Sequence, residues 1–488
     1  MAERQFAQFR RLTASALVLL LASFLQFHHV APDRRFLPDE AFFMTFARAA
    51  AVKGAWLLPG PLDKPPLSLY FSALSMTFIG NTVDAGGLLQ LDVHMGEFAG
   101  MLPNAFLAIL LTALMTRLAR RLYGSDWAAA FAGLLSLSSP YLLAFGVSAF
   151  TDMSSLFFST AALYFALTGG WARTGLLLGL AFWSKQQAAL IVPLILLCLL
   201  AQARRRPEWI RLTLALSSLI GALLIWDFAR PEASIFLQAA ANNAPDQWLA
   251  PPSQWLARLV AWLEPVLWLL GPPLVTGALL LATALMSLRR FGAAPATSLT
   301  IHIERALLIY IAGYLGLHTI LRFQPYDRYL LLMLPPLILL IAGWLARRSQ
   351  VLQVGLALLL VASGLWSCNA RVSIGGDRGA SEGIDALAQH LSAKPVATVI
   401  YDPWLGWELS YYLGAWHDKR RVHFPTAAAL AAGALALDEQ GDRYFVAPVE
   451  QAHVEWLAAL RNAGFEARVD YARGRYIVYR LTPASTEP

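Results

Sequence analysis

The chain has 488 residues, of which 57% are hydrophobic and 14% are charged, and its formal net charge is +7. Apolar runs of membrane-spanning length recur from Leu12 to about Cys368, which is typical of a polytopic membrane protein rather than a soluble enzyme. The basic residues lie mostly in short clusters between these runs, so membrane topology explains the positive charge better than nucleic-acid binding does. The two cysteines, Cys198 and Cys368, provide neither a disulfide framework nor a cysteine zinc site.

Window hydropathy predicts about eleven membrane spans. The first apolar run lacks a cleavage site typical of a signal peptide, so we expect it to remain as a span. The expected spans are residues 12–30, 98–116, 127–147, 152–168, 174–186, 187–203, 211–229, 263–288, 303–321, 329–346 and 351–370.

Clusters of arginine set the expected orientation of these spans. With this count of spans, every cluster falls on one side of the membrane, and the positive-inside rule makes that side cytoplasmic. The opposite, periplasmic side of a bacterial inner membrane then receives the 31–97 loop, the 230–262 loop and the C-terminal tail. The clusters are Arg4, Arg10 and Arg11; Arg117, Arg120 and Arg121; Arg204, Arg205 and Arg206; Arg289 and Arg290; and Arg347 and Arg348.

The first outer loop is long and contains two acids, Asp39 and Glu40, and a lysine, Lys64, which follows Asp63. The helical spacing of the aromatic residues in 39–52 predicts a helix that lies in the membrane interface, with Arg48 on its surface. Prolines at 59 and 61 interrupt the chain, and 67–79 is expected to form a second interfacial or re-entrant helix.

Past a glycine-rich linker at 375–379, the pattern alternates between helix and strand, which predicts a small α/β domain. We therefore expect two domains, a membrane domain at 1–370 and a periplasmic α/β domain at 371–488. The expected helices are Ser381–Ser392, Glu408–Leu413, Thr426–Leu437 and Val454–Ala463, and the expected strands are Val396–Tyr401, Arg421–Phe424, Tyr444–Val446, Phe465–Tyr471 and Arg475–Leu481.

The predicted topology gathers charged residues on the outer face. Carboxylates and cations at a membrane surface suit a reaction between an acceptor hydroxyl and an anionic, lipid-linked donor. A carboxylate takes the hydroxyl proton, and lysine or arginine offsets the charge that develops on a departing phosphate. The gathered residues are Asp39, Glu40, Lys64, Asp152, Lys185, Gln186, Arg322, Tyr326, Asp327 and Arg328.

Four motifs in a fixed order carry a family resemblance: Pro38-Asp-Glu40; Lys64-Pro-Pro66 with Tyr70; Phe182-Trp-Ser-Lys185; and Asp327-Arg-Tyr329 before Met333-Leu-Pro-Pro336. Together they resemble the GT-C glycosyltransferases of the protein O-mannosyltransferase and aminoarabinose transferase type. The similarity runs from the N-terminus to about Arg347. The chain departs from the pattern at 185–187, where it reads Lys-Gln-Gln in place of the more usual Lys-Gly.

The resemblance implies an inverting transferase that uses a polyprenyl-phosphate sugar and has its active site on the periplasmic face. By position, Asp39 resembles the family's catalytic aspartate, with Glu40 beside it, and Lys64 resembles its donor-phosphate lysine. From the residues themselves, we expect Arg322, Arg328 and Tyr326 to assist in phosphate binding. Secondary candidates are Asp152, Lys185, Tyr70 and Asp327.

The expected partners are the membrane, a polyprenyl-phosphate sugar and a lipid, glycan or protein acceptor, without nucleic acid. No metal site is assigned, although Asp39 and Glu40 are oxygen ligands of the kind that a divalent cation prefers, so metal dependence is left open.

Simpler explanations exist for these residues. The two acids near the start of a helix also serve as caps, Lys64 suits an interfacial anchor, and Lys185 suits a buried partner of an acid. A transporter or lipid flippase, and a non-catalytic membrane assembly subunit, are the alternative functions.

Overall fold

The computed structural model describes residues 2–30, 33–202, 206–243, 247–292, 299–370, 372, 374–377, 379–437, 442–451 and 453–483. Arg204 and Arg205, used above for orientation, lie outside these residues. The chain divides into two units. The membrane unit comprises Met1–Pro32, Leu57–Ser72 and Met101–Gly375, and the sheet unit comprises Asp33–Trp56, Ala73–Gly100 and Gly376–Pro488. The expected domain boundary at 370/371 stays a prediction.

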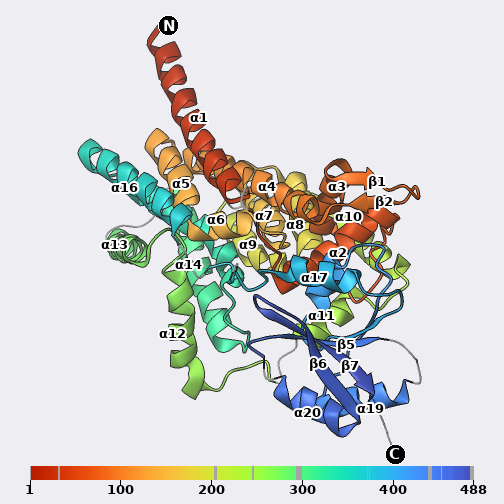
Figure 1. The fold of residues 1–488 in the computed structure, drawn as a ribbon. Coiled ribbons are helices and arrows are strands. Elements are labelled where there is room, and N and C mark those ends of the chain that lie inside the picture. The colour runs from red at the N-terminus through yellow and green to blue at the C-terminus, as the bar shows by residue number, and fades with distance from the viewer. Residues whose placement is uncertain are drawn as a thin grey trace, which may run out of the picture. The chain divides into compact units, whose positions relative to one another are not determined.

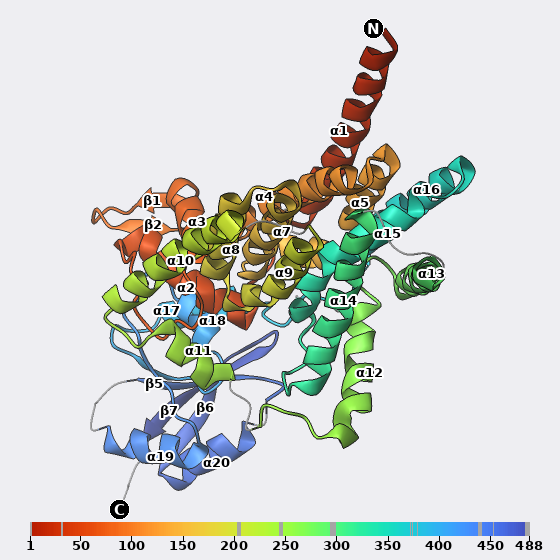
Figure 2. The same cartoon turned by 180° about the vertical axis from the view of Figure 1, so that it is seen from behind.

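The membrane unit is helical (Figures 1 and 2). Within it, α5 packs against α1, α15 and α16, while α8 packs between α7 and α10. The helices are α1 (Ala2–Val30), α5 (Asp126–Ser138), α6 (Pro140–Gly146), α7 (Asp152–Thr168), α8 (Trp171–Ser184), α9 (Val192–Ala201), α10 (Arg206–Ala229), α11 (Ile235–Asn243), α12 (Trp255–Val266), α13 (Pro273–Gly292), α14 (Leu299–Ile320), α15 (Leu334–Leu345) and α16 (Gln350–Asn369), with 3₁₀ turns η1 (Gln186–Ile191), η2 (Pro252–Gln254) and η3 (Asp327–Met333). Two helices, α3 (Leu67–Phe78) and α4 (Val93–Tyr123), belong partly to each unit.

Among the described residues, four helical segments are long and apolar enough to cross a membrane: Val93–Tyr123, Glu208–Ala229, Asp327–Leu345 and Gln350–Asn369. The pair α5 and α6, bent by 61°, makes a fifth if it counts as one span. Other expected spans correspond to shorter apolar helices such as Ser15–Val30 and Gln186–Ala201. The chain is therefore a polytopic helical membrane protein, while the count of eleven spans stays a prediction.

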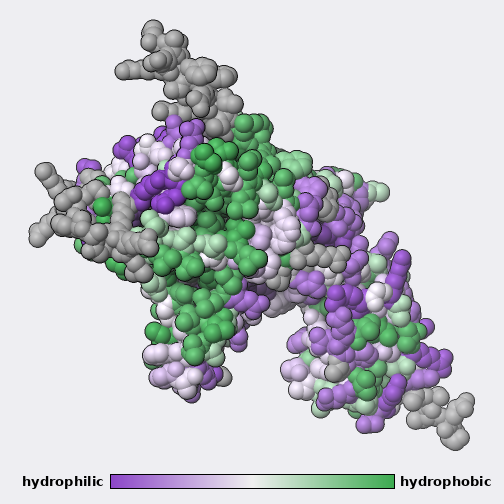
Figure 3. Space-filling model, turned by 90° about the vertical axis from the view of Figure 1, so that its left-hand side faces the viewer, coloured by the Kyte–Doolittle hydropathy of each residue, from purple (hydrophilic) through white to green (hydrophobic). Residues whose placement is uncertain are grey.

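The surface of the membrane unit carries many large apolar side chains. Figure 3 shows a broad hydrophobic surface on one face of the molecule. A soluble protein rarely exposes a contiguous apolar area of this kind, so lipid is the solvent that suits it. Exposed apolar residues on α12, α13 and α16 include Leu256, Val260, Leu263, Leu274, Leu281, Leu285, Val351 and Leu358.

Two of the expected spans, 127–147 and 263–288, contain a break in the helix. The 127–147 segment bends at Ser139, which is extended (φ −69°, ψ 117°) because it precedes Pro140, and its hydroxyl accepts a hydrogen bond from the Leu142 amide. The 263–288 segment is interrupted between α12 and α13, where Gly271 precedes two prolines that lack an amide hydrogen. Most of α12 lies within the 230–262 segment that the sequence predicts to be a loop.

The sheet unit contains a five-stranded sheet with the strand order β4-β3-β5-β7-β6. Strands β4, β3 and β5 are parallel, and β5, β7 and β6 are antiparallel, with an irregularity between Val469 and Tyr471. Figures 1 and 2 show α17 on one face of the sheet and α19 and α20 on the other. The elements are α17 (Ile384–Ser392), β3 (Val399–Tyr401), α18 (Gly406–Tyr412), β4 (Arg420–Val422), α19 (Ala427–Ala436), β5 (Arg443–Pro448), α20 (Val454–Asn462), β6 (Phe465–Arg473) and β7 (Tyr476–Pro483), and a separate hairpin joins β1 (Asn81–Val83) to β2 (Leu89–Leu91).

All nine elements expected in the α/β region are present, with shifted ends. Strand β3 begins at Val399 instead of 396, because Ala397 has a left-handed backbone (φ 64°) that interrupts an extended chain. The core between the sheet and its two outer helices contains Leu430, Phe445 and Leu460.

The predicted helix at 39–52 in the first outer loop is confirmed as α2 (Pro38–Lys53). The prediction that Arg48 lies exposed on the surface of this helix is wrong. Arg48 is only 4% exposed, because α18 packs against α2 and covers it. The guanidinium donates hydrogen bonds to the carbonyl oxygens of Ser410 (2.9 Å) and Tyr411, which lie in the last turn of α18. Arg48 therefore caps the carboxyl end of α18, where the helix dipole favours a cation. The interfacial position of α2 stays a prediction.

Replacing Arg48 with Met is expected to lower the unfolding free energy of the sheet unit by about 1–3 kcal/mol, because the last carbonyls of α18 lose a charged donor. Thermal unfolding of the full-length protein in detergent measures the effect. The control is Lys53→Met, which removes an exposed cation from the end of the same helix. Equal melting temperatures for the two variants would contradict the capping role.

Candidate active site

The ten predicted site residues are divided between the two units. Asp39 and Glu40 belong to the sheet unit, and the other eight belong to the membrane unit. The latter are Lys64, Tyr70, Asp152, Lys185, Arg322, Tyr326, Asp327 and Arg328.

The two acids at the start of α2 have different surroundings. Leu37 is extended, Pro38 occupies the first helical position, and Glu40 turns back so that its Oε2 accepts a hydrogen bond from the Leu37 amide (2.8 Å). Glu40 is 1% exposed, whereas Asp39 is only partly buried. Glu40 thus fixes the start of the helix, and Asp39 is the more accessible acid.

Asp152 and Lys185 form a buried ion pair in the membrane unit. Lys185 Nζ lies 2.5 Å from Asp152 Oδ1, and both side chains are less than a tenth exposed. Asp152 is in the first turn of α7, and Lys185 lies at the junction between α8 and η1, where the backbone is extended. The ammonium also lies 5.5 Å from the ring centre of Tyr329. Each charge is therefore compensated by the other.

Because Asp152 and Lys185 form an ion pair, the effects of substituting them on stability are expected to be non-additive. Asp152→Asn alone is expected to lower stability by about 3–5 kcal/mol, because it leaves a buried ammonium without its partner. The double variant Asp152→Asn/Lys185→Gln is expected to recover part of this loss, as measured by thermal unfolding in detergent. A loss of stability in the double variant equal to the sum of the losses in the two single variants would contradict an energetic coupling between Asp152 and Lys185.

The loop that carries Lys64 is held on both sides. Lys64 Nζ pairs with Asp63 Oδ2 at 2.6 Å, and the Gln186 side chain donates to the Asp63 carbonyl oxygen at 2.9 Å. The Ser68 hydroxyl donates to the carbonyl oxygen of Thr151, next to α7. The charges of Lys64 and Arg328 both act on Lys185. The folded membrane unit thus brings three predicted cations into one neighbourhood.

Arg230 also holds this loop, and sequence reasoning missed it. Its guanidinium donates to the carbonyl oxygens of Leu58 (3.0 Å) and Gly60 (2.7 Å), and its side chain is fully buried. Asp227 Oδ1 lies 3.8 Å from it and also accepts from the Ile235 amide. The sequence shows Asp227 and Arg230 at the end of an apolar run, which marks them as candidates for a structural role. It does not show that Arg230 bonds to the backbone of residues 58 and 60, which are about 170 positions earlier.

The segment around η3 provides the remaining candidates. The Asp327 carboxylate accepts hydrogen bonds from the amides of Gly375 (2.7 Å) and Arg328 (2.6 Å), so it organises the backbone. The Arg328 guanidinium lies 5.3 Å from the ring centres of both Phe150 and Tyr326. Tyr326 is half exposed.

Arg322 and Tyr70, two of the predicted site residues, bond to segments other than the Lys64 loop. The Arg322 amide donates to the Trp248 carbonyl oxygen (3.0 Å), and its guanidinium donates to Gln247 (3.4 Å). Among the described residues, Arg322 is therefore hydrogen-bonded to the 247–248 segment and not to the loop of Lys64. The Tyr70 hydroxyl accepts a hydrogen bond from the Trp226 indole at 2.7 Å.

The sheet unit contains a cavity of about 620 Å³ that adjoins the start of α2. Sequence reasoning did not identify it, because its walls come from α2, α18, the segment that follows β3, and the end of β4 with the residue after it. Side chains on its walls include Pro38, Asp402, Trp404, Trp407, Glu408 and Arg421.

The two acids of this cavity are hard to ionise. Burial raises the pKa of Glu408 to about 7, and the negative charges of Asp402 and Asp39 add to the effect. Burial also raises the pKa of Asp402 to about 6, although the positive charges of Arg421 and His423 oppose the rise. Glu408 therefore exchanges a proton near neutral pH.

The raised pKa of Glu408 predicts a pH-dependent stability. The folded protein retains a proton that the unfolded chain loses above its ordinary pKa of 4.5, so this group destabilises the fold as pH rises towards 7. Glu408→Gln removes that effect, which is at most about 3–4 kcal/mol because the pKa rises from 4.5 to about 7 and one pKa unit corresponds to about 1.4 kcal/mol. The melting temperature of the variant relative to the unmodified protein is expected to rise between about pH 5 and pH 8.

The control for this measurement is Glu455→Gln, at an exposed position of α20. A difference between Glu408→Gln and the unmodified protein that does not change with pH would contradict the raised pKa.

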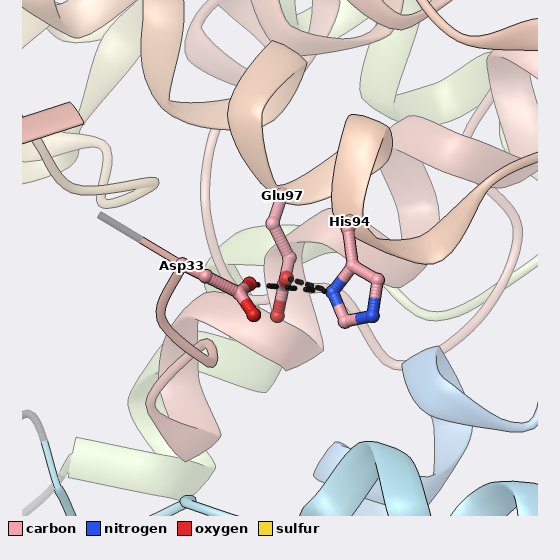
Figure 4. A group of neighbouring side chains, drawn as sticks. All are labelled: Asp33, His94 and Glu97. Atoms are coloured by element: carbon pink, nitrogen blue, oxygen red, sulfur yellow. Dashed lines mark hydrogen bonds and ion pairs between the residues drawn. The ribbon is translucent and has the colours of Figure 1, made fainter. Parts of the chain in front are cut away.

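Asp33, His94 and Glu97 form a cluster in the sheet unit, with His94 Nδ1 at 3.5 Å from Asp33 Oδ1 and 3.2 Å from Glu97 Oε2 (Figure 4). Such a group has the composition of a metal site, but the Arg35 guanidinium donates to both carboxylates. A metal ion would have to displace that guanidinium, so the residues fit an ion-pair network instead.

Comparisons with known proteins support the resemblance stated above. A family described as dolichyl-phosphate-mannose-protein mannosyltransferase matches residues 63–228. An undecaprenyl phosphate-alpha-4-amino-4-deoxy-L-arabinose arabinosyl transferase of Serratia proteamaculans (strain 568) is 27% identical over 249 residues, which cover 47% of this chain. The match spans 41% of that relative's length.

The fold agrees over nearly the whole chain. The crystal structure of ArnT from Cupriavidus metallidurans in the apo state has a TM-score of 0.66 at 15% identity, covering 97% of this chain and 98% of ArnT. The same protein bound to undecaprenyl phosphate gives 0.65 at 14% identity, covering 96% and 97%. The predicted fold is confirmed, and the family match and the relative support the resemblance to this type of glycosyltransferase.

Proposed function

We propose that this chain, which has the GT-C fold, is an inverting glycosyltransferase that moves a sugar from a polyprenyl phosphate to an acceptor hydroxyl. The relative from Serratia is named for a donor of that kind, and a protein with the same fold has been crystallised with undecaprenyl phosphate. The matched family segment contains Lys64, Asp152 and Lys185. We place the reaction at the periplasmic face of a bacterial inner membrane, with a cytoplasmic N-terminus and a periplasmic C-terminal domain.

The cations near Lys64 are the observation that carries this proposal. The charge of Lys185 is matched by Asp152 and that of Lys64 by Asp63, so a bound phosphate would share the Lys64 ammonium with Asp63 and have the Arg328 guanidinium in the same neighbourhood. Lys64 is partly exposed, and its loop is held by Gln186 and Arg230. A positioned ammonium and a planar guanidinium suit a phosphate, and they stabilise the charge that develops as the phosphate departs.

Asp39 is the proposed general base. It takes the proton of the acceptor hydroxyl while the acceptor oxygen bonds to the anomeric carbon of the donor. The bond between that carbon and the phosphate oxygen breaks, and the electron pair leaves with the polyprenyl phosphate. One displacement of this kind inverts the anomeric carbon. Glu40, held against the Leu37 amide, is a positioning residue that fixes the start of the helix bearing Asp39.

Substitution separates the two roles. Asp39→Asn is expected to lower kcat by about 10²–10⁴-fold, the usual contribution of a general base. Lys64→Ala is expected to raise the donor KM by about tenfold, equal to about 1.4 kcal/mol of binding energy. Transfer of radiolabel from a synthetic polyprenyl-phosphate sugar, with purified membranes as the source of acceptor, measures both.

The control is Asp84→Asn, at an exposed position of the β1–β2 hairpin. Undiminished transfer by Asp39→Asn at equal expression would remove Asp39 from the mechanism. A change in acceptor KM alone for Lys64→Ala would refute its contact with the donor phosphate.

A further inference from the structure

We propose that the cavity beside the start of α2 binds a neutral, hydroxyl-rich sugar ring of the acceptor. This inference rests on the glycosyltransferase function proposed above and assigns one substrate class to a separate part of the site. Every residue used in the argument belongs to the sheet unit.

Two indole rings on the wall suit the apolar face of a sugar. Trp407 is 48% exposed, and its ring centre lies 5.1 Å from that of Phe42, which supports it from α2. Trp404 packs against Trp456 and Phe445, at ring-centre distances of 5.3 and 6.0 Å. Large aromatic rings held in this way bury apolar area at little cost in side-chain entropy, and the C–H faces of a sugar ring are a matching partner.

The polar groups of the cavity suit hydroxyls rather than an anion. Asp402 is 3% exposed, and among the described residues its Oδ1 has no hydrogen-bond partner. Glu408 is 6% exposed and titrates near neutral pH, so it accepts a hydrogen bond in one form and donates in the other. Buried polar groups require partners, and hydroxyls supply both donors and acceptors.

The two terminal nitrogens of Arg421 are used by protein groups, whereas its Nε has no hydrogen-bond partner among the described residues. The Arg421 guanidinium donates to the Gly406 carbonyl oxygen (2.7 Å) and the Ser410 hydroxyl (2.6 Å), and it lies 3.5 Å from Asp402 Oδ2. The negative charge of Asp402, whose pKa of about 6 leaves it mostly ionised at neutral pH, disfavours a phosphate or a carboxylate in this cavity. This chemistry differs from that around Lys64, where three cations, Lys64, Lys185 and Arg328, lie in one neighbourhood.

The place of the cavity connects it with the proposed base. Pro38 lines the cavity, Asp39 is the next residue, and the charge of Asp39 acts on Glu408. A cavity of about 620 Å³ lies within the usual range of small-ligand sites, about 300–1,000 Å³. A sugar bound there holds its hydroxyls close to the carboxylate that is proposed to accept a proton.

Binding of simple sugars to the full-length protein in detergent tests this inference. The probes are methyl glucoside, methyl mannoside and N-acetylglucosamine at millimolar concentration, with glucuronic acid as an anionic probe, and the measurement is saturation-transfer NMR. At least one neutral probe is expected to bind, more strongly than glucuronic acid. Trp407→Ala and Glu408→Gln are expected to reduce its signal at least about fivefold, equal to about 1 kcal/mol.

The matched control is Trp416→Ala, because Trp416 lies in the same unit with a similar exposure of 43% and does not line the cavity. Its signal is expected to equal that of the unmodified protein. Signals that survive in both cavity variants, equal binding of glucuronic acid, or no binding of any neutral probe would each overturn the inference.

A second measurement separates this inference from the proposed function. Radiolabelled undecaprenyl phosphate is bound to the same preparations, and Trp407→Ala is expected to retain that binding while Lys64→Ala loses it. Loss of sugar binding in Trp407→Ala together with retained lipid-phosphate binding supports the cavity assignment. Failure of the unmodified protein to bind undecaprenyl phosphate counts against the proposed function, whereas the sugar measurement still decides the cavity.

Discussion

Charge in an apolar protein must be compensated, and this constraint determines where the ionisable side chains of the membrane unit lie. Asp152 and Lys185 neutralise each other, and the fully buried Arg230 side chain donates to two carbonyl oxygens of the Lys64 loop. A buried ion pair adds little stability by itself, but removing one partner is costly, so the pair fixes α7 against the α8–η1 junction. The loop of Lys64 is attached to the same junction through Gln186. The charges of Asp152 and Lys185 are thus matched within the scaffold, and Lys64 is paired with Asp63 at a more exposed position.

The sheet unit meets the same constraint in a different way. The two terminal nitrogens of the buried Arg48 donate to the last carbonyl oxygens of α18, whereas Glu408 and Asp402 are buried at a cavity wall, where burial raises the pKa of both. Near neutral pH the Asp402 carboxylate, with a pKa of about 6, is mostly ionised, whereas Glu408, with a pKa of about 7, is divided between a form that accepts and a form that donates a hydrogen bond. A transferase of the proposed type has two ligands, one anionic and one rich in hydroxyls. A cation-rich region and an acid-lined cavity are the two environments that those ligands require.

Local patterns predicted the elements but not the contacts between them. The α/β elements after residue 380 and the helix after Pro38 follow from periodicity and turn residues, which act over a few positions. The burial of Arg48 depends on α18, more than 350 residues away in the sequence, and the role of Arg230 depends on carbonyl oxygens about 170 residues earlier. The cavity escaped prediction for the same reason. Its acids follow a short strand and open a short helix, and only the folded unit brings them to Pro38.

The two neighbouring acids of α2 illustrate how one helix start produces two roles. Successive helical residues point in different directions, about 100° apart around the axis, so a side chain that turns back to cap the helix leaves its neighbour facing elsewhere. Glu40 caps the helix, and its buried carboxylate gains a hydrogen bond that it would lose by leaving the Leu37 amide. Asp39 has the more open position, and its charge acts on Glu408 at the cavity. Of the two, Asp39 is therefore the acid whose surroundings suit a general base, and Glu40 is the one that keeps it in place.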